Sequence, residues 1–263
     1  MQALRFVLRA AVLAIAVATS ASANQVQDLH TLLGQQSDFN GSVYASRGDI
    51  TILDTALGWR DEAHKIPVTH QTLFNIASVT KSLTAVAVMK QVEAGKLKLS
   101  TPIGALFANV PKDKSSITIE QLLTHTSGLA HGYAANGKRS RKDALVAIFA
   151  QPLGGGPGKF LYTDDGYALL AAAVEVSSGS DFCTFLHQNI FAPAHIHARC
   201  WQDIMQNGEY GSAAILNNPP DQNLRGKNWG YIGSGGIWAS ADDLANYLRA
   251  LLSGTILSAP VFR

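Results

Sequence analysis

The sequence predicts an α+β fold in which a cluster of helices packs on an antiparallel sheet. Two β-rich runs stand near the start of the chain, and segments with helical periodicity follow one another from residue 79 onward. The chain of 263 residues is 47% hydrophobic and 15% charged, a composition typical of one globular domain with a substantial core. Strands followed by a run of helices indicate that the helices form their own layer.

The first residues have the composition of an export signal. Arg5 and Arg9 give a short basic region, residues 10–18 are apolar, and Ala21-Ser22-Ala23 has the small residues of a cleavage site. The apolar run is about half the ~20 residues that span a bilayer, so we expect no stable membrane span after cleavage. The pattern predicts a periplasmic or secreted protein with a signal peptide at residues 1–23 and a domain at residues 24–263.

The strands are predicted by their residue types. Gly41–Ser46 and Ile50–Thr55 are rich in β-branched and aromatic residues, and Arg47-Gly48-Asp49 separates them. A short glycine-containing turn between two such runs predicts a β-hairpin.

The helices are predicted by apolar periodicity and by capping residues. Thr118 with Gln121, and Ser240 with Asp243, have the spacing of capping boxes at helix starts. The expected helices span residues 79–93, 118–125, 143–149, 166–178, 181–190 and 240–252.

The two cysteines, Cys183 and Cys200, both lie in the part predicted to be exported. An oxidising compartment would let them pair, although two separate buried thiols fit the sequence nearly as well. His195 and His197 with Cys200 could also be metal ligands. No carboxylate accompanies them, so ordinary surface or core histidines are the favoured interpretation and no metal site is expected.

The charge pattern points to a small-molecule partner. The formal net charge is +2, and no dense block of Lys and Arg is present. This pattern gives no sign of binding to nucleic acid or to an anionic membrane surface.

The segment Ser78-Val-Thr-Lys81 carries the chemistry. Ser78 and Lys81 stand three apart at a helix start, so both side chains lie on one face and can touch. A serine hydroxyl becomes nucleophilic when a neighbouring group takes its proton, and a buried amine that is neutral part of the time can do so. Alone, the spacing is weak evidence, because a helix cap followed by a solvated lysine has the same pattern.

Three longer stretches strengthen this interpretation: residues 72–84, with Ser78 and Lys81, residues 92–100, and residues 117–129, with His-Thr-Ser-Gly-Leu. Together they closely resemble the class C β-lactamase and penicillin-binding-protein-like family, which also contains esterases, D-aminopeptidases and D-alanyl-D-alanine carboxypeptidases. The resemblance extends over residues 41–252. It implies a β-lactamase/transpeptidase-like fold, Ser78 as nucleophile, Lys81 as activating amine and no cofactor.

Tyr162 and Asp164 match the family's Tyr-x-Asn motif with one departure. The resemblance implies that Tyr162 relays protons beside Lys81, whereas a buried structural tyrosine is the alternative. Asp164 stands where most of the family has Asn and is expected to contact substrate. An ionised carboxylate cannot donate a hydrogen bond to a substrate carbonyl, which favours an ester or amide hydrolase over an efficient β-lactamase.

The family pattern continues to a third motif, Lys-Thr-Gly or His-x-Gly, on an inner strand. This chain ends at Arg263 without it, so we expect a C-terminally truncated domain with C-terminal strands missing and a sheet edge left unpaired. The missing strand would supply one oxyanion donor, the other being the backbone N–H of Ser78. Loss of one donor typically lowers turnover by roughly 10²–10³-fold.

Two hypotheses follow. The first is a serine hydrolase that forms an acyl-enzyme with an ester, a peptidoglycan-derived D-amino-acid peptide or a β-lactam. The second is a catalytically inactive relative that binds peptidoglycan or a partner protein. We expect His125 to belong to a structural turn. Trp201, Trp229 and Trp238 could line a pocket, but packing in the core is the favoured interpretation.

Overall fold

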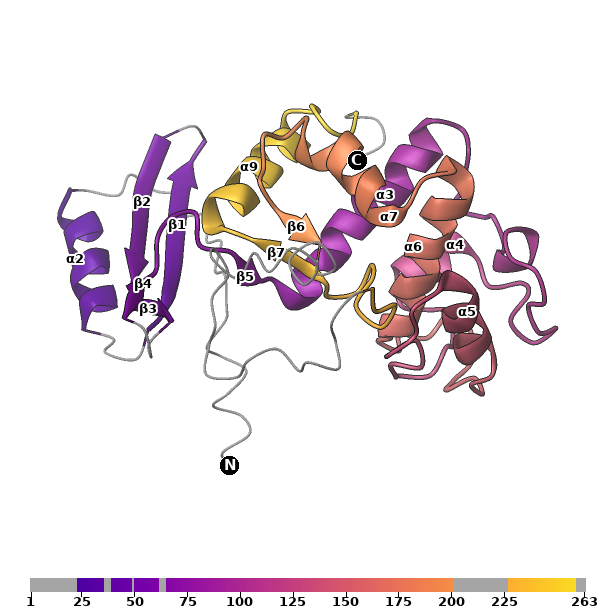
Figure 1. The fold of residues 1–263 in the computed structure, drawn as a ribbon. Helices are drawn as coiled ribbons and strands as arrows, with labels where there is room; N and C mark the ends of the chain where they lie inside the picture. Colours follow the sequence, from indigo (N-terminus) through magenta and orange to yellow (C-terminus); the bar gives the residue numbers. More distant parts are fainter. Residues whose placement is uncertain (1–22, 36–38, 49, 62–64, 201–226, 259–263) are drawn as a thin grey trace.

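The fold consists of helices packed with small antiparallel sheets, which confirms the predicted α+β class (Figure 1). The computed structural model describes residues 23–35, 39–48, 50–61, 65–200 and 227–258. Residues 1–22 of the predicted signal peptide lie outside the described residues. The described strands form three separate sheets, rather than the one sheet that the sequence predicted.

The predicted hairpin is confirmed. Strand β1 (Gly41–Arg47) pairs antiparallel with β2 (Ile50–Leu57), and Val43 faces Thr55 across the pair. Helix α2 (Ala23–Gly34), which the sequence did not predict, lies beside β2 in Figure 1.

Two more small sheets follow the hairpin. Strands β3 (Trp59–Asp61) and β4 (Ile66–Pro67) form an antiparallel pair. In the third sheet the order is β5-β7-β6, with β5 (Phe74–Asn75) and β6 (Arg199–Cys200) on either side of β7 (Ile237–Ala239). This sheet lies next to the start of the long central helix.

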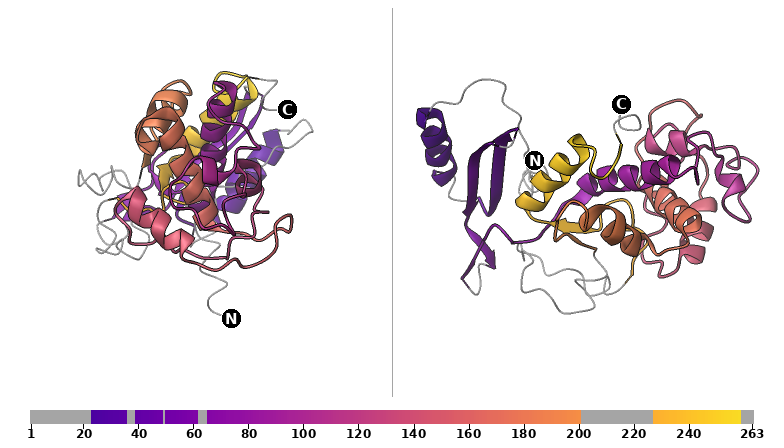
Figure 2. Two further views of the ribbon diagram at one scale, coloured as in Figure 1. Left: turned by 90° about the vertical axis from the view of Figure 1, so that its right-hand side faces the viewer. Right: turned by 90° about the horizontal axis from the view of Figure 1, so that it is seen from above.

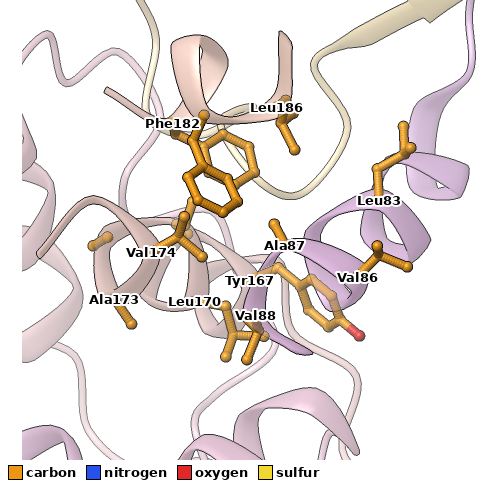
Figure 3. Packing of buried hydrophobic residues seen from close by; sticks show 14 of the residues in the cluster. Leu83, Val86, Ala87, Val88, Tyr167, Leu170, Ala173, Val174, Phe182 and Leu186 are labelled. Atoms are coloured by element: carbon orange, nitrogen blue, oxygen red, sulfur yellow. The ribbon is translucent and has the colours of Figure 1, made fainter. Parts of the chain in front are cut away.

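The hydrophobic core is centred on three helices: α3 (Thr80–Glu93), α6 (Asp164–Ser178) and α7 (Phe182–Leu186). Figure 3 shows apolar side chains of α3 meeting those of α6 and α7. Residues 168–174 of α6 are at most 1% exposed, because this helix is covered on every side. The alanines in this stretch leave room for neighbouring helices to approach closely, and burial of the larger side chains is the main stabilising contribution.

The predicted helix caps are formed. The Thr118 side chain accepts from Gln121 N at the start of α4 (Ile119–Leu123), and Ser240 accepts from Asp243 N at the start of α9 (Ala241–Leu252). Both capping boxes are complete.

Several helix boundaries differ from the prediction. Helix α4 ends at Leu123, and α5 (Arg141–Phe149) begins two residues earlier than predicted, because Ser140 provides its cap. The predicted helix at residues 181–190 is α7 followed by a π-helical turn, η4 (His187–Phe191). The remaining short turns are η2 (Ala77–Val79) and η3 (Ile103–Ala105).

A disulfide bond joins Cys183 of α7 to Cys200 of β6, with their Cα atoms 6.2 Å apart. This settles the question that the sequence left open. It also occupies the sulfur that a metal site with His195 and His197 would need. Trp229 and Trp238 are buried at 1% and 8% exposure, as expected of packing residues, and Trp201 lies outside the described residues.

Helix α9 lies between the hairpin and α3, as Figure 2 shows from above. A groove of about 1160 Å³ is lined mainly by β1 and α9. Arg249 of α9 crosses to the hairpin, where it donates a hydrogen bond to the Tyr44 hydroxyl. Among the described residues, no single helix has the length and apolar composition to cross a bilayer; α6 with residues 182–191 reaches them only as a pair bent by 75°.

Candidate active site

Ser78 lies in a strained turn before α3. The turn η2 precedes α3, and the backbone N–H of Ile76 donates to Ile237 O in β7. Ala77 adopts a left-handed conformation (φ 45°), which costs a non-glycine residue about 1–2 kcal/mol. The Asn75 side chain holds that conformation by accepting from Ala77 N at 2.8 Å while donating to Gly235 O. The turn leaves the Ser78 side chain exposed.

Lys81 lies one helical turn below Ser78 and is 7% exposed. Its Nζ donates to Ser78 Oγ at 3.2 Å, to Asp164 Oδ1 at 2.5 Å and to the Ser234 carbonyl at 2.8 Å. A lysine ammonium has three N–H groups and no acceptor. The three contacts therefore use its full set of hydrogens.

Asp164 is the first residue of α6, where a negative charge is favoured by the helix dipole. Its side chain is 5% exposed and forms a buried ion pair with Lys81. The structure therefore brings Asp164 to the lysine. The predicted contact with substrate stays a prediction.

Tyr162 contacts both the nucleophile and Lys81. Its hydroxyl is 2.7 Å from Ser78 Oγ, and Lys81 Nζ is 4.8 Å from the centre of its ring. Nδ1 of His131 donates to the Tyr162 backbone carbonyl at 2.9 Å. These contacts place the phenol oxygen beside the serine and the positive charge beside the phenol.

His125 supports Tyr162 from behind. The two rings stack with centroids 4.5 Å apart, and Nδ1 of His125 accepts from Thr163 N. Burial, and then the positive charge of Lys81, lower the pKa of His125. The imidazole is accordingly neutral and acts as an acceptor, in keeping with the structural role predicted for it.

The glycine-rich loop at residues 230–236 supplies the third acceptor for Lys81. Ser234 Oγ donates to Gly230 O, and Thr84 of α3 donates to Gly233 O at 2.8 Å, so the loop is fixed against α3. Gly233 has a φ of 79°, and a Cβ there would lie 2.4 Å from Tyr167 O. Ser234 could not be found from sequence, because the group that accepts from Lys81 is its backbone carbonyl, which leaves no signature in residue type.

Two further tyrosines border the ion pair, and the sequence did not single them out. Burial, and then the negative charge of Asp164, raise the pKa of Tyr133 to about 12, and its hydroxyl contacts Asp164. The Tyr167 hydroxyl donates to Leu123 O at 3.0 Å, and burial raises its pKa to about 12. Both phenols therefore stay protonated near neutral pH and act as hydrogen-bond donors.

The arrangement joins an exposed hydroxyl, a phenol and a buried ammonium–carboxylate pair. All four residues predicted from sequence, Ser78, Lys81, Tyr162 and Asp164, meet at one point from two separate parts of the chain. A hydroxyl within hydrogen-bond distance of a proton acceptor is the requirement for nucleophilic catalysis. The geometry is thus suited to attack on a carbonyl group.

Comparison with known proteins gives consistent results. The family described as beta-lactamase matches residues 28–262. Penicillin-binding protein 4* of Bacillus subtilis strain 168 is 29% identical over 184 residues, covering 64% of this chain and 39% of that protein. The protein PbpX of the same strain is 28% identical over 228 residues, covering 84% of this chain and 56% of its own. This chain thus spans about half the length of the curated relatives it matches.

Solved structures give the same result. The penicillin-binding protein from Bacillus halodurans is 30% identical with a TM-score of 0.74, covering 89% of this chain and 75% of that one. The D-amino acid amidase from Ochrobactrum anthropi SV3 shares the fold at 23% identity and a TM-score of 0.70, covering 90% of this chain and 72% of that one. The match over residues 28–262 and these relatives show that this chain belongs to the beta-lactamase family, whose members are serine hydrolases of the penicillin-binding-protein type.

Proposed function

We propose that this chain is a serine acyl hydrolase that forms an acyl-enzyme on Ser78. One observation carries the proposal: Ser78 Oγ is exposed and lies within hydrogen-bond distance of both the Tyr162 hydroxyl and Lys81 Nζ. Membership of a family of serine hydrolases supports it.

In the first half of the reaction, Ser78 Oγ attacks the substrate carbonyl carbon and its proton passes to the ionised oxygen of Tyr162. Tyr162 accepts this proton because all three hydrogens of Lys81 are already donated. The tetrahedral intermediate then collapses, the bond to the leaving group breaks, and Tyr162 returns the proton to that group. The backbone N–H of Ser78 is one donor available to the oxyanion.

In the second half, a water molecule attacks the acyl-enzyme. Tyr162 takes a proton from the water and then gives it to Ser78 Oγ as the acid product leaves. Lys81 keeps its positive charge throughout and stabilises the negative charge on the phenol oxygen. Asp164 holds Lys81 in place and balances its charge. This assignment moves the proton-accepting role from Lys81, where the sequence suggested it, to Tyr162.

The proposed substrates are esters, peptidoglycan-derived D-amino-acid peptides or β-lactams. The names of the relatives support the cell-wall class, because two of them are penicillin-binding proteins. Asp164 faces Lys81 as an acceptor and has no amide hydrogen to offer a substrate carbonyl. This favours an ester or amide over a β-lactam. An exported domain at residues 24–263, in the periplasm or outside the cell, would meet such substrates.

The test is the intact mass of the folded protein after incubation with a fluorophosphonate. We expect the mass of one adduct on the wild type and on Ser82→Ala, a matched variant one turn along α3, and no adduct on Ser78→Ala. Circular dichroism would confirm that all three are folded. Labelling that survives in Ser78→Ala would refute the proposal.

Absence of label from folded wild-type protein would also refute it. If a muropeptide then raised the melting temperature without being hydrolysed, the chain would be an inactive relative that binds peptidoglycan.

A further inference from the structure

A second cluster of titratable groups lies outside the proposed active site. It contains Asp54 of β2, His70 from the segment between β4 and β5, and Asp242 in the first turn of α9. One ligand atom from each residue lies within 4.8 Å of the other two. His70 Nδ1 and Asp54 Oδ1 are 2.7 Å apart. Three parts of the chain thus bring two carboxylates and one imidazole together.

The Asp242 side chain has one unsatisfied oxygen. Its Oδ1 is shielded from solvent and has no hydrogen-bond partner among the described residues. Buried polar atoms in folded proteins nearly always have a partner, so an orphaned carboxylate oxygen calls for an explanation. Two ionised carboxylates brought this close repel each other, and a cation between them would relieve the repulsion.

We propose that Asp54, His70 and Asp242 bind a divalent transition-metal ion, with Zn²⁺ as the best fit. Two carboxylates and one imidazole are ordinary zinc ligands, and three protein ligands leave a fourth position for water. The two negative charges would be neutralised by the ion, and the orphaned oxygen of Asp242 would gain a partner. No residue of the proposed catalytic group takes part.

The geometry allows this with small side-chain movements. Ligand atoms around a tetrahedral zinc ion at about 2.0–2.2 Å lie roughly 3.4 Å from one another. The Asp54–His70 contact at 2.7 Å must therefore open, and the wider separations, up to 4.8 Å, must close. The Asp54 and His70 side chains are 37% and 42% exposed, so neither is locked by packing.

The ion would fasten the hairpin to the helical layer. Asp54 belongs to β2 and Asp242 to α9, and β1 lies between these two elements in Figure 1. The neighbouring carboxylate Asp243 is already used, since it accepts from Ser240 N and from His197 N.

The test is binding of Zn²⁺ to the full chain by calorimetry, with Co²⁺ absorption as a second readout. We expect one ion per chain that is lost, or weakened at least about 10–100-fold, in His70→Gln. His197→Gln is the matched control, because this histidine is exposed and lies beside Asp243 instead of Asp242. It should bind zinc like the wild type. We also expect zinc to raise the melting temperature of the wild type and not that of Asp242→Asn.

Either of two results would overturn the proposal: no binding by the wild type, or equal binding by wild type and His70→Gln. If Asp242→Asn fails to fold, the comparison of zinc binding by His70→Gln and the wild type still tests the proposal, because the exposed side chain of His70 is not required for packing. Phosphonate labelling of Ser78 should be unchanged in His70→Gln, which separates this proposal from the proposed function.

Discussion

The buried Lys81–Asp164 pair gives a double-mutant cycle with a large expected signal. The two side chains are 8% and 5% exposed, and Nζ and Oδ1 are 2.5 Å apart. At an effective dielectric constant of about 20, opposite charges at that distance attract by about 7 kcal/mol before desolvation is counted. Removing one partner of a buried pair costs about 3–5 kcal/mol, because the other charge is left uncompensated. The loss of unfolding free energy in Asp164→Asn should lie at the lower end of this range, because the new amide oxygen still accepts a hydrogen bond.

The assay is urea unfolding of Lys81→Met, Asp164→Asn and the double variant. We expect each single variant to lose about 3–4 kcal/mol, and the double variant to lose less than the sum by at least about 2 kcal/mol, because replacing both charges leaves neither unpaired. The control cycle pairs Asp164→Asn with Lys90→Met. Lys90 lies nine residues beyond Lys81 on α3, which is about 13 Å along the helix axis. In this control, the unfolding free energy lost by the double variant should equal the sum of the two single losses to within about 0.5 kcal/mol. Additivity in the Lys81 cycle would refute the ion pair.

Three other outcomes are expected. Because the pKa of His125 is lowered from 6.5, the unfolded chain takes up a proton that the folded chain resists, so the unfolding free energy should fall as pH drops below about 6.5. An unchanged pH profile in His125→Gln would contradict this. Removing the Cys183–Cys200 bond, which closes a loop 17 residues long, should cost about 3 kcal/mol and lower the melting temperature by roughly 6–12 °C in differential scanning fluorimetry. Gly233→Ala should lower the free energy of unfolding by more than about 3 kcal/mol and abolish phosphonate labelling. In the control, Gly137→Ala, the φ is similar and no atom lies near the added Cβ, so the loss should be about 1–2 kcal/mol and labelling should persist. Equal losses of stability in urea unfolding would contradict the clash.

The parts of the fold that sequence predicted well are those fixed by local chemistry. Thr118 and Ser240 each cap a helix through a residue three positions later, so the whole interaction is visible in a tetrapeptide. The hairpin is also local, since its strands are joined by one tight turn. The π-helical turn after Leu186 was missed because its residues have ordinary helical periodicity, and only packing decides the extra residue in the turn.

In the candidate site, too, the contact within one short segment could be predicted, whereas contacts that depend on packing could not. Ser78 and Lys81 share one helical face, so their contact follows from a spacing of three. Asp164 was expected to face the substrate, and its pairing with Lys81 depends on how α6 packs against α3. The contribution of Ser234 could not be predicted from sequence, because it depends on the fixed position of a backbone carbonyl. The catalytic roles, the export signal and the domain boundaries stay predictions.

The hydrogen bonds of Lys81 also bear on how the protein folds. Its partners Asp164 and Ser234 are 83 and 153 residues away along the chain, so they meet only after remote parts of the chain have come together. Contacts between remote residues form late, because closing a long loop has the largest entropic cost. A partly folded chain would then have α3 and a serine but no aligned nucleophile. Recovery of phosphonate labelling during refolding would lag behind recovery of helix content, and it would report completion of the native topology.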